Sequence, residues 1–223
     1  KRQDHEQLKK AAHIFATAPS DVICLQARLN YYNPDDNWLT RQFTLEYSTW
    51  FRLVLPGLYR FGLPIPLGGT SNHFRTKALR DIGAWDAFNV TEDADLGMRI
   101  AAFGYRCGLL PSTTYEEANC RLGNWLRQRS RWQKGFLQTW LTHMRHPIDL
   151  YRRLGPWGFS SLHLVIGGAL FTALAPHLFI AASIGFVALK YLDQSLSYPI
   201  TLQISNSLVF ITGYGVSFLS GAI

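Results

Sequence analysis

The sequence predicts an α/β domain, an amphipathic segment at a membrane surface and a membrane-spanning region, in that order along the chain. In the first region, short β-prone apolar segments alternate with amphipathic helical patterns, which is typical of α/β folds. Between Arg121 and Arg153 there are eight Lys and Arg residues and a single acidic residue, Asp149. After residue 154 only two residues are charged. The three predicted regions span residues 1–135, 136–157 and 158–223.

Apolar residues at helical spacing predict five helices before the apolar tail. These helices span residues 4–17, 38–55, 76–82, 93–103 and 124–144. We expect the second helix to end before Pro56, because proline lacks the N–H that a helix interior requires. Residues 56–69 are rich in proline and glycine and are expected to lack regular structure. Gly83 and Gly104 are expected to end the third and fourth helices.

Short apolar segments with high β propensity predict three strands. They span residues 22–29, 71–74 and 106–110. Pro111 is expected to end the last strand, since a proline cannot donate a hydrogen bond to a neighbouring strand. Asn33-Pro34 is a turn signal and predicts a loop over residues 31–36.

The apolar tail begins with 32 residues, 158–189, that carry no formal charge. A bilayer core needs about 20 apolar helical residues, so this run is too long for one upright span and too short for two. It predicts either one long tilted helix kinked at Pro176 or a short hairpin that turns there. A second span is expected at residues 204–223. A buried core helix is the alternative interpretation of the run.

Residues 136–157 combine aromatic and basic side chains, among them Trp140 and Arg145. We expect a helix over residues 136–154 that lies at the membrane surface. Because Lys and Arg collect on the cytoplasmic side of membranes, the α/β domain is expected in the cytoplasm and the chain in the inner cell membrane. The net charge of +7 would also suit a nucleic-acid partner. The basic residues are local and adjoin the apolar tail, however, so we expect membrane lipids as partners and no nucleic acid.

Thr91, Glu92 and Asp93 form the first candidate site. A threonine followed by two acids commonly caps a helix, and capping alone would explain the tripeptide. Asp93, however, lies three and seven residues before apolar positions of the predicted helix, so we expect it on the buried face. Withdrawal from water raises the pKa of a carboxyl group and suits a general base. Asp95 is expected at the surface or in a capping role.

Residues 128–132 (QRSRW) form the second candidate site. On a helix, Gln128, Arg131 and Trp132 share one face, with another tryptophan one turn earlier. An arginine fork suits a diphosphate, and a tryptophan plane suits the apolar face of a sugar. An amphipathic surface helix is the alternative, and it explains Arg129, which we expect in solvent.

The TED tripeptide at 91–93, QRSRW about 35 residues later and the apolar spans after it resemble the processive family 2 glycosyltransferases. That family includes cellulose and hyaluronan synthases. The stretch from Gly68 to Asp86 is also similar to the family's small-residue segment ahead of TED. The resemblance covers residues 1–157. It implies the C-terminal half of a GT-A (Rossmann-like) glycosyltransferase domain, followed by an interfacial helix and transmembrane helices.

This resemblance also implies an activity and a set of site residues. Asp93 would be the base that deprotonates the acceptor hydroxyl in an inverting transfer from a nucleotide sugar, expected to be a UDP-sugar. The acceptor would be a growing polysaccharide or a lipid-linked molecule. The residues implied to bind donor and acceptor are Gly69, Thr70, Thr91, Glu92, Gln128, Arg131 and Trp132.

The resemblance further implies a divalent cation, Mg²⁺ or Mn²⁺, in the full-length enzyme. The family's metal-binding D-x-D and its uridine-binding acid are expected upstream of Lys1, because Asp35 and Asp36 lie in the Asn-Pro turn and are no substitute. We therefore expect that the chain alone binds no metal and transfers no sugar. The three cysteines are odd in number and lack metal-ligand spacing, so they are expected to be reduced, buried thiols.

Three functions remain open from the sequence. The first is a polysaccharide synthase that extends and exports a chain. The second is a non-processive transferase that modifies a lipid-linked acceptor with the same residues. The third is a non-catalytic membrane receptor or scaffold built on a glycosyltransferase fold; the intact TED and QRSRW motifs argue against it.

Overall fold

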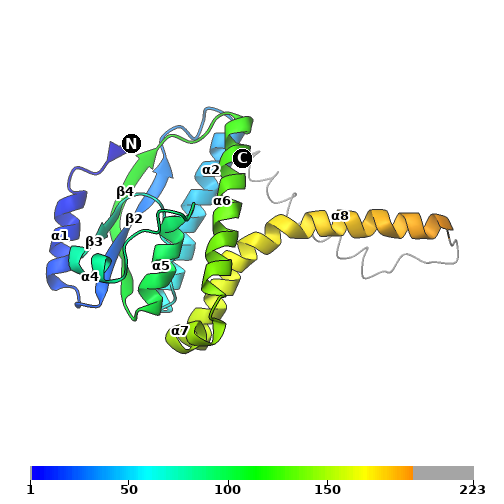
Figure 1. Ribbon diagram of the computed structural model, residues 1–223. Helices are drawn as coiled ribbons and strands as arrows, with labels where there is room; N and C mark the ends of the chain where they lie inside the picture. The colour runs from blue at the N-terminus through cyan, green and yellow to red at the C-terminus, as the bar shows by residue number, and fades with distance from the viewer. Residues whose placement is uncertain (1, 193–223) are drawn as a thin grey trace.

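A mixed four-stranded sheet with the strand order β1-β4-β2-β3 organises the α/β part of the molecule (Figure 1). The computed structural model describes residues 2–192. The strands are β1 (Arg2–Gln3), β2 (Val22–Tyr31), β3 (Asn72–Phe74) and β4 (Arg106–Glu116). The two long central strands, β2 and β4, run parallel, whereas β1 and β3 pair antiparallel at the two edges. The alternation of strands and helices thus gives the predicted α/β class.

Helices follow the predicted order, with differences at several ends. They are α1 (Gln7–Thr17), α2 (Trp38–Thr49), the π-helical segment η1 (Trp50–Val54), α3 (Leu55–Arg60), α4 (Thr76–Asp81), α5 (Glu92–Ala102), α6 (Leu122–His143), α7 (Pro147–Leu162), the π-helical segment η2 (His163–Gly167) and α8 (Gly168–Leu192). Gly83 and Gly104 follow α4 and α5 with φ values of 84° and 79°, the left-handed backbone that glycine adopts readily. The two predicted glycine stops are therefore confirmed.

Two prolines do not end their elements, contrary to prediction. The helix that begins at Trp38 continues through η1 and past Pro56 to Arg60. Pro56 lies in the first turn of α3, directly after the widened π-helical turn, where its missing N–H is tolerated. Pro111 lies inside β4, in an irregularity where the pairing with β2 shifts register between Ala27 and Arg28. A bulge of this kind accommodates a proline within a strand.

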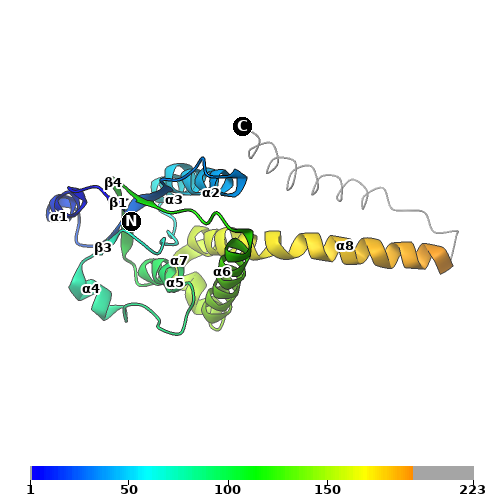
Figure 2. The ribbon, with the colours of Figure 1, turned by 90° about the horizontal axis from the view of Figure 1, so that it is seen from above.

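Helices cover both faces of the sheet (Figures 1 and 2). On one face, α1 packs on β2 and β4 through a cluster that includes Ala11, Leu25 and Leu110. On the other face, η1, α3 and α5 pack on β2 in the largest core cluster of the described residues. Its members include Ile23, Leu29, Phe51, Leu55, Leu96 and Ile100. The helix α6 runs alongside α5, and α7 closes the lower end of this pair around Met98 and Leu150. The first turn of α5 is thereby held between the sheet and α6.

The predicted single helix over residues 136–154 is wrong. The helix α6 ends at His143 and α7 begins at Pro147, with the proline in the first turn where a helix accepts it. A second break inside α7 occurs at Gly155, which has a φ of 68°. The predicted domain boundary between residues 135 and 136 falls inside α6.

The apolar tail forms a long helix that extends away from the α/β part (Figure 2). Within residues 2–192, the stretch Pro147–Leu192 is the one long and apolar enough to cross a membrane, and 12% of its most apolar 18-residue window is buried. Because α8 continues through Pro176, the predicted hairpin does not form there. A buried core helix does not fit side chains as exposed as those of Phe171, Leu178 and Ile184. The span predicted at residues 204–223 lies outside the described residues.

Candidate active site

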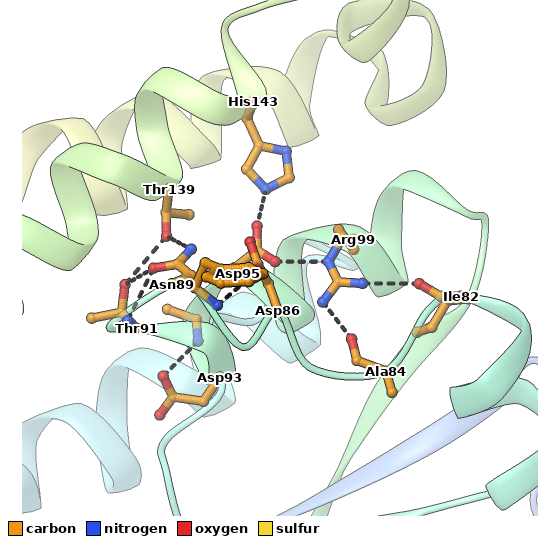
Figure 3. Close-up of polar contacts among 12 residues, drawn as sticks. Ile82, Ala84, Asp86, Asn89, Thr91, Asp93, Asp95, Arg99, Thr139 and His143 are labelled. Atoms are coloured by element: carbon orange, nitrogen blue, oxygen red, sulfur yellow. Dashed lines mark hydrogen bonds and ion pairs between the residues drawn. The ribbon is translucent and has the colours of Figure 1, made fainter.

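A small network of buried hydrogen bonds connects the turn that precedes α5 to α6 (Figure 3). The Asn89 carboxamide oxygen accepts the Thr91 backbone N–H at 3.0 Å, and the Asn89 Nδ2 donates to the Thr139 hydroxyl at 2.8 Å. The hydroxyls of Thr91 and Thr139 are also in hydrogen-bond contact, at 3.2 Å. The Thr91 side chain makes no capping hydrogen bond to α5, so capping does not explain this residue. Instead, its hydroxyl joins two helices.

Gly135 of α6 permits this close packing. A Cβ atom at this position would lie 2.4 Å from Cγ2 and 2.9 Å from the backbone nitrogen of Thr91, which is far inside van der Waals contact. Gly135 follows Trp132 by one helical turn and Gln128 by two. The helix that carries QRSRW therefore touches the TED tripeptide directly.

Asp93 is half-buried in the first turn of α5. Its Oδ1 accepts the backbone N–H of Ala94 at 2.8 Å, and a Cβ placed on Gly69 would come 3.1 Å from its Oδ2. Burial disfavours the charged carboxylate and raises the pKa of Asp93 to about 6, and the nearby Glu92 carboxylate acts in the same direction. The predicted withdrawal of Asp93 from water is thus confirmed.

Asp95 is not at the surface, contrary to prediction: it is 4% exposed. Its two oxygens accept hydrogen bonds from Arg99 Nε at 2.7 Å and from His143 Nε2 at 3.0 Å (Figure 3). The same Arg99 guanidinium donates to the carbonyls of Ile82 and Ala84. Although burial would raise the pKa of Asp95, the hydrogen bonds and charges of His143 and Arg99 hold it below its usual value. Asp95 therefore joins α5, the end of α6 and the 82–84 turn.

The two arginines of QRSRW differ from prediction in their exposure: Arg129 is half-buried and Arg131 is exposed. Arg129, predicted in solvent, lies between α6 and α2, with its guanidinium carbon 4.9 Å from the Phe43 ring centroid and 5.0 Å from that of Trp132. Its Nη1 also donates to Glu46 Oε1 at 2.7 Å. Arg131 is exposed and its side chain extends from the surface of α6. Periodicity placed Arg131 on the face of Trp132 but could not show that α2 would cover the neighbouring face.

The other residues of the motif are fixed by neighbours. Trp132 is half-buried and stacks on Phe43, with ring centroids 6.4 Å apart. The Gln128 carboxamide oxygen accepts a hydrogen bond from Asn119 at 2.7 Å. Both side chains are therefore held in place before any ligand binds.

The predicted residues Gly69 and Thr70 belong to the 68–72 loop, which passes beside Asp93. Gly69 is exposed, and a Cβ atom added to it would lie 3.1 Å from the Asp93 Oδ2. The Thr70 hydroxyl is buried, and within the described part of the chain it has no hydrogen-bond partner. Sequence analysis did not identify Gln26, Asn89, Gly135 or Thr139, which hold the loop and the TED turn. Their only sequence signal is a polar or small residue at a position where the pattern calls for an apolar one.

No group of three or more His, Cys, Asp and Glu side chains within residues 2–192 could hold a metal ion. Asp36 accepts a hydrogen bond from Asn33, and Asp35 is exposed near Arg41. The residues present do not fit a divalent cation, so no chemical step is assigned to one. Cys24 and Cys107 are buried free thiols as predicted, whereas Cys120 is exposed, which corrects the prediction for that residue.

Comparison with known proteins identifies relatives of this chain. Residues 2–214 match the family described as glycosyl transferase family group 2. The probable glycosyltransferase YdaM of Bacillus subtilis is 28% identical over 98 residues, which is 44% of this chain and 23% of YdaM. The beta-monoglucosyldiacylglycerol synthase of Synechocystis is 28% identical over 121 residues, 52% of this chain and 24% of that protein. The Trichormus variabilis enzyme of the same description is 28% identical over 138 residues, 60% of this chain and 28% of that protein.

The chain thus matches about a quarter of the length of these curated relatives. The family match, in contrast, extends over nearly the whole chain, through the α/β part and the apolar helix. On this basis the chain belongs to glycosyl transferase family group 2.

Proposed function

We propose that this chain forms the acceptor side of an inverting glycosyltransferase that works at the cytoplasmic face of a membrane. It would transfer a sugar, expected to be a hexose, from a UDP-sugar to a growing polysaccharide or lipid-linked acceptor. The observation that carries the proposal is the Asp93 carboxylate, which is half-buried at the start of α5, has a pKa of about 6 and is lined by the Gly69 backbone. A base with such a pKa is ionised at neutral pH yet remains a competent proton acceptor.

In this mechanism, Asp93 accepts the proton of the acceptor hydroxyl as that oxygen bonds to the anomeric carbon of the donor. The bond from the anomeric carbon to the diphosphate oxygen breaks, and the diphosphate leaves with the electron pair. Attack opposite the leaving group inverts the anomeric configuration. The exposed guanidinium of Arg131 is free to donate hydrogen bonds to the diphosphate, and Gln128 and Trp132 would line the site.

The remaining assignments are also proposals. Residues 1–135 would be the acceptor-side part of a GT-A domain of the cellulose-synthase type, 136–157 an interface segment and 158–223 a membrane-spanning region. Mg²⁺ or Mn²⁺ would be supplied with ligands by other parts of the intact protein, and the chain alone would transfer no sugar. The exposed apolar surface of α8 supports a place in the membrane. The description of two relatives as beta-monoglucosyldiacylglycerol synthases supports a lipid acceptor.

The test is Asp93→Asn in the intact protein, assayed in membranes with a panel of radiolabelled UDP-sugars. Loss of a general base is expected to reduce transfer about 10²–10⁴-fold. Asp81→Asn, an exposed acid of α4, is the matched control and should leave transfer unchanged. Undiminished transfer by Asp93→Asn would refute the base assignment. Absence of transfer by the unaltered protein with every UDP-sugar would instead favour the alternative function, a non-catalytic receptor or scaffold on this fold.

A further inference from the structure

Gln26 is a buried polar residue in the middle of an apolar strand. It is 1% exposed and lies on β2, between Leu25 and Ala27. Burying a carboxamide is unfavourable unless both of its ends form hydrogen bonds. The Gln26 Oε1 accepts the backbone N–H of Gly68 at 2.8 Å, and its Nε2 donates to the carbonyl of Thr70 at 3.1 Å. Gln26 therefore forms hydrogen bonds with both neighbours of Gly69 in the chain, Gly68 and Thr70.

The same loop, residues 68–72, is held at further points. The Asn72 Nδ2 donates to the Gly68 carbonyl at 2.6 Å. The Ala27 backbone N–H donates to the carbonyl of Ser71 at 3.0 Å, and the Ser71 hydroxyl contacts the Thr114 hydroxyl of β4. Ser71 has a φ of 61°, a left-handed conformation that a non-glycine residue adopts only when its surroundings enforce it. These hydrogen bonds connect the loop to the central strands β2 and β4.

The loop conformation matters for the candidate site because it places Gly69 next to Asp93. Gly69 faces Oδ2 of Asp93: a Cβ atom added to this glycine would lie 3.1 Å from that oxygen. Residues 68–72 (GGTSN) contain no titratable side chain, so the loop brings no charge to the carboxylate. Glu92 is the charged neighbour that acts on Asp93 among the described residues. The segment that borders the Asp93 carboxylate at Gly69 is therefore uncharged and is held in place by Gln26.

We propose that Gln26 is a positioning residue for glycosyl transfer, which holds the 68–72 loop so that the Gly69 backbone shields the Asp93 carboxylate from water. This proposal rests on the proposed function of Asp93 as the base. Gln26 does not touch the reacting atoms; it acts through Gly69. A purely structural role would stabilise the sheet but would leave the proton affinity of Asp93 unchanged.

The experiment uses the intact protein in membranes with Gln26→Met, which removes both hydrogen bonds at similar size, and Gln26→Asn, which stays polar but is too short to bridge. Arg75→Met is the matched control, because Arg75 fastens the other end of β3 through the carbonyls of Val22 and Phe15. The first measurement is hydrogen–deuterium exchange of the peptide covering residues 67–73, which does not depend on activity. Exchange there should be about tenfold faster in both Gln26 variants and unchanged in the control.

The second measurement is the pH dependence of kcat. With a base of pKa about 6, the unaltered protein should retain about a tenth of its plateau rate at pH 5. Water that reaches Asp93 lowers its pKa toward the ordinary value. The plateau kcat of the Gln26 variants should be lower than that of the unaltered protein. At pH 5, however, each variant should retain at least about half of its own plateau kcat. An unchanged acid limb in Gln26→Asn would overturn the positioning role, as would unchanged exchange in the loop. If Asp93→Asn retains transfer, the proposed function fails instead, and that result is separate from both Gln26 measurements.

Discussion

Gly135 of α6 lies against Thr91, so that no side chain larger than hydrogen fits between α6 and the turn that carries Asp93. This contact brings the two sequence motifs together. Thr91 precedes Asp93 by two residues along the backbone, and Gly135 follows Trp132 by three. Thr139 and Asn89 secure the same junction one turn further along α6. The position of Asp93 relative to the QRSRW helix is therefore set by one glycine and three hydrogen bonds.

Gly135→Ala is expected to push α6 away from the TED turn. The new methyl group would meet the Thr91 backbone at 2.9 Å, which cannot yield as a flexible side chain would. We expect a loss of about 1–3 kcal/mol in unfolding free energy and a fall in kcat of at least about tenfold. Thermal unfolding in detergent and a transfer assay check both effects.

Gly123→Ala is the matched control for that substitution. Gly123 lies on the same helix, and a Cβ atom added there would meet no atom of another described element within 4 Å. Gly123 is the second residue of α6, so alanine should increase helix stability there by less than the roughly 0.5–1 kcal/mol expected in a helix interior. Equal behaviour of the two variants would show that helix propensity, and not the contact with Thr91, determines the outcome.

Asp93→Asn is expected to stabilise the folded protein at neutral pH. The pKa of Asp93 is raised to about 6 from 3.8, so the folded state binds its proton more tightly than the unfolded state does. That preference favours folding below pH 4 and is lost as pH rises through 6, which leaves an unfavourable buried charge at pH 7.5. Asparagine removes this charge, and the gain is up to about 3 kcal/mol at 1.36 kcal/mol per pH unit.

The measurement for Asp93→Asn is the change in Tm relative to the unaltered protein at several pH values. The increase should be largest at pH 7.5 and should shrink steadily toward pH 4. A constant increase at all pH values would mean that the carboxylate is solvated in the folded state. Asp81→Asn should show no increase at either pH.

Asp95→Ala is expected to destabilise the fold strongly. Removing this carboxylate leaves Arg99 and His143 without their shared partner in a region where His143 is 8% exposed in its side chain. Breaking a buried ion pair in this way costs about 3–5 kcal/mol. Asp149→Ala removes an exposed partner of Arg152 and should change the unfolding free energy by less than about 1 kcal/mol. Comparable losses in the two variants would contradict the role of Asp95 in joining α5 to α6.

The sequence predicted the fold class and the order of the elements because local patterns determine both. Val22 to Tyr31 is mostly apolar and β-prone, and α5 carries apolar residues at helical spacing. Proline was less informative: Pro56 and Pro111 remain inside their elements because a π-helical turn and a strand irregularity accommodate them. The π-helical turn and the strand irregularity depend on how neighbouring elements pack, and no sequence motif predicts them.

The site was predicted less completely, for a related reason. Asp93 could be placed on a buried face from its own helix alone. Asp95 and Arg129, in contrast, are fixed by partners 48 and 83 residues away, His143 and Glu46. No periodicity within one helix reveals such pairs. The surface or capping role predicted for Asp95 and the solvent position predicted for Arg129 were therefore wrong.

Arg131 and Arg129 are therefore expected to respond differently to substitution. Arg131→Ala should leave Tm unchanged, because this side chain is exposed, but should lower kcat about 10²–10³-fold if its guanidinium stabilises the leaving diphosphate. Arg129→Ala should lower both Tm and kcat, since the guanidinium packs over Trp132 and Phe43 and pairs with Glu46. Arg127→Ala, also exposed on α6, controls for loss of positive charge and should change neither quantity. If Arg127 and Arg131 behave alike, Arg131 acts only through general charge. If Arg131→Ala lowers kcat at unchanged Tm and Arg127→Ala does not lower kcat, the exposed arginine of the motif is the one that meets the donor.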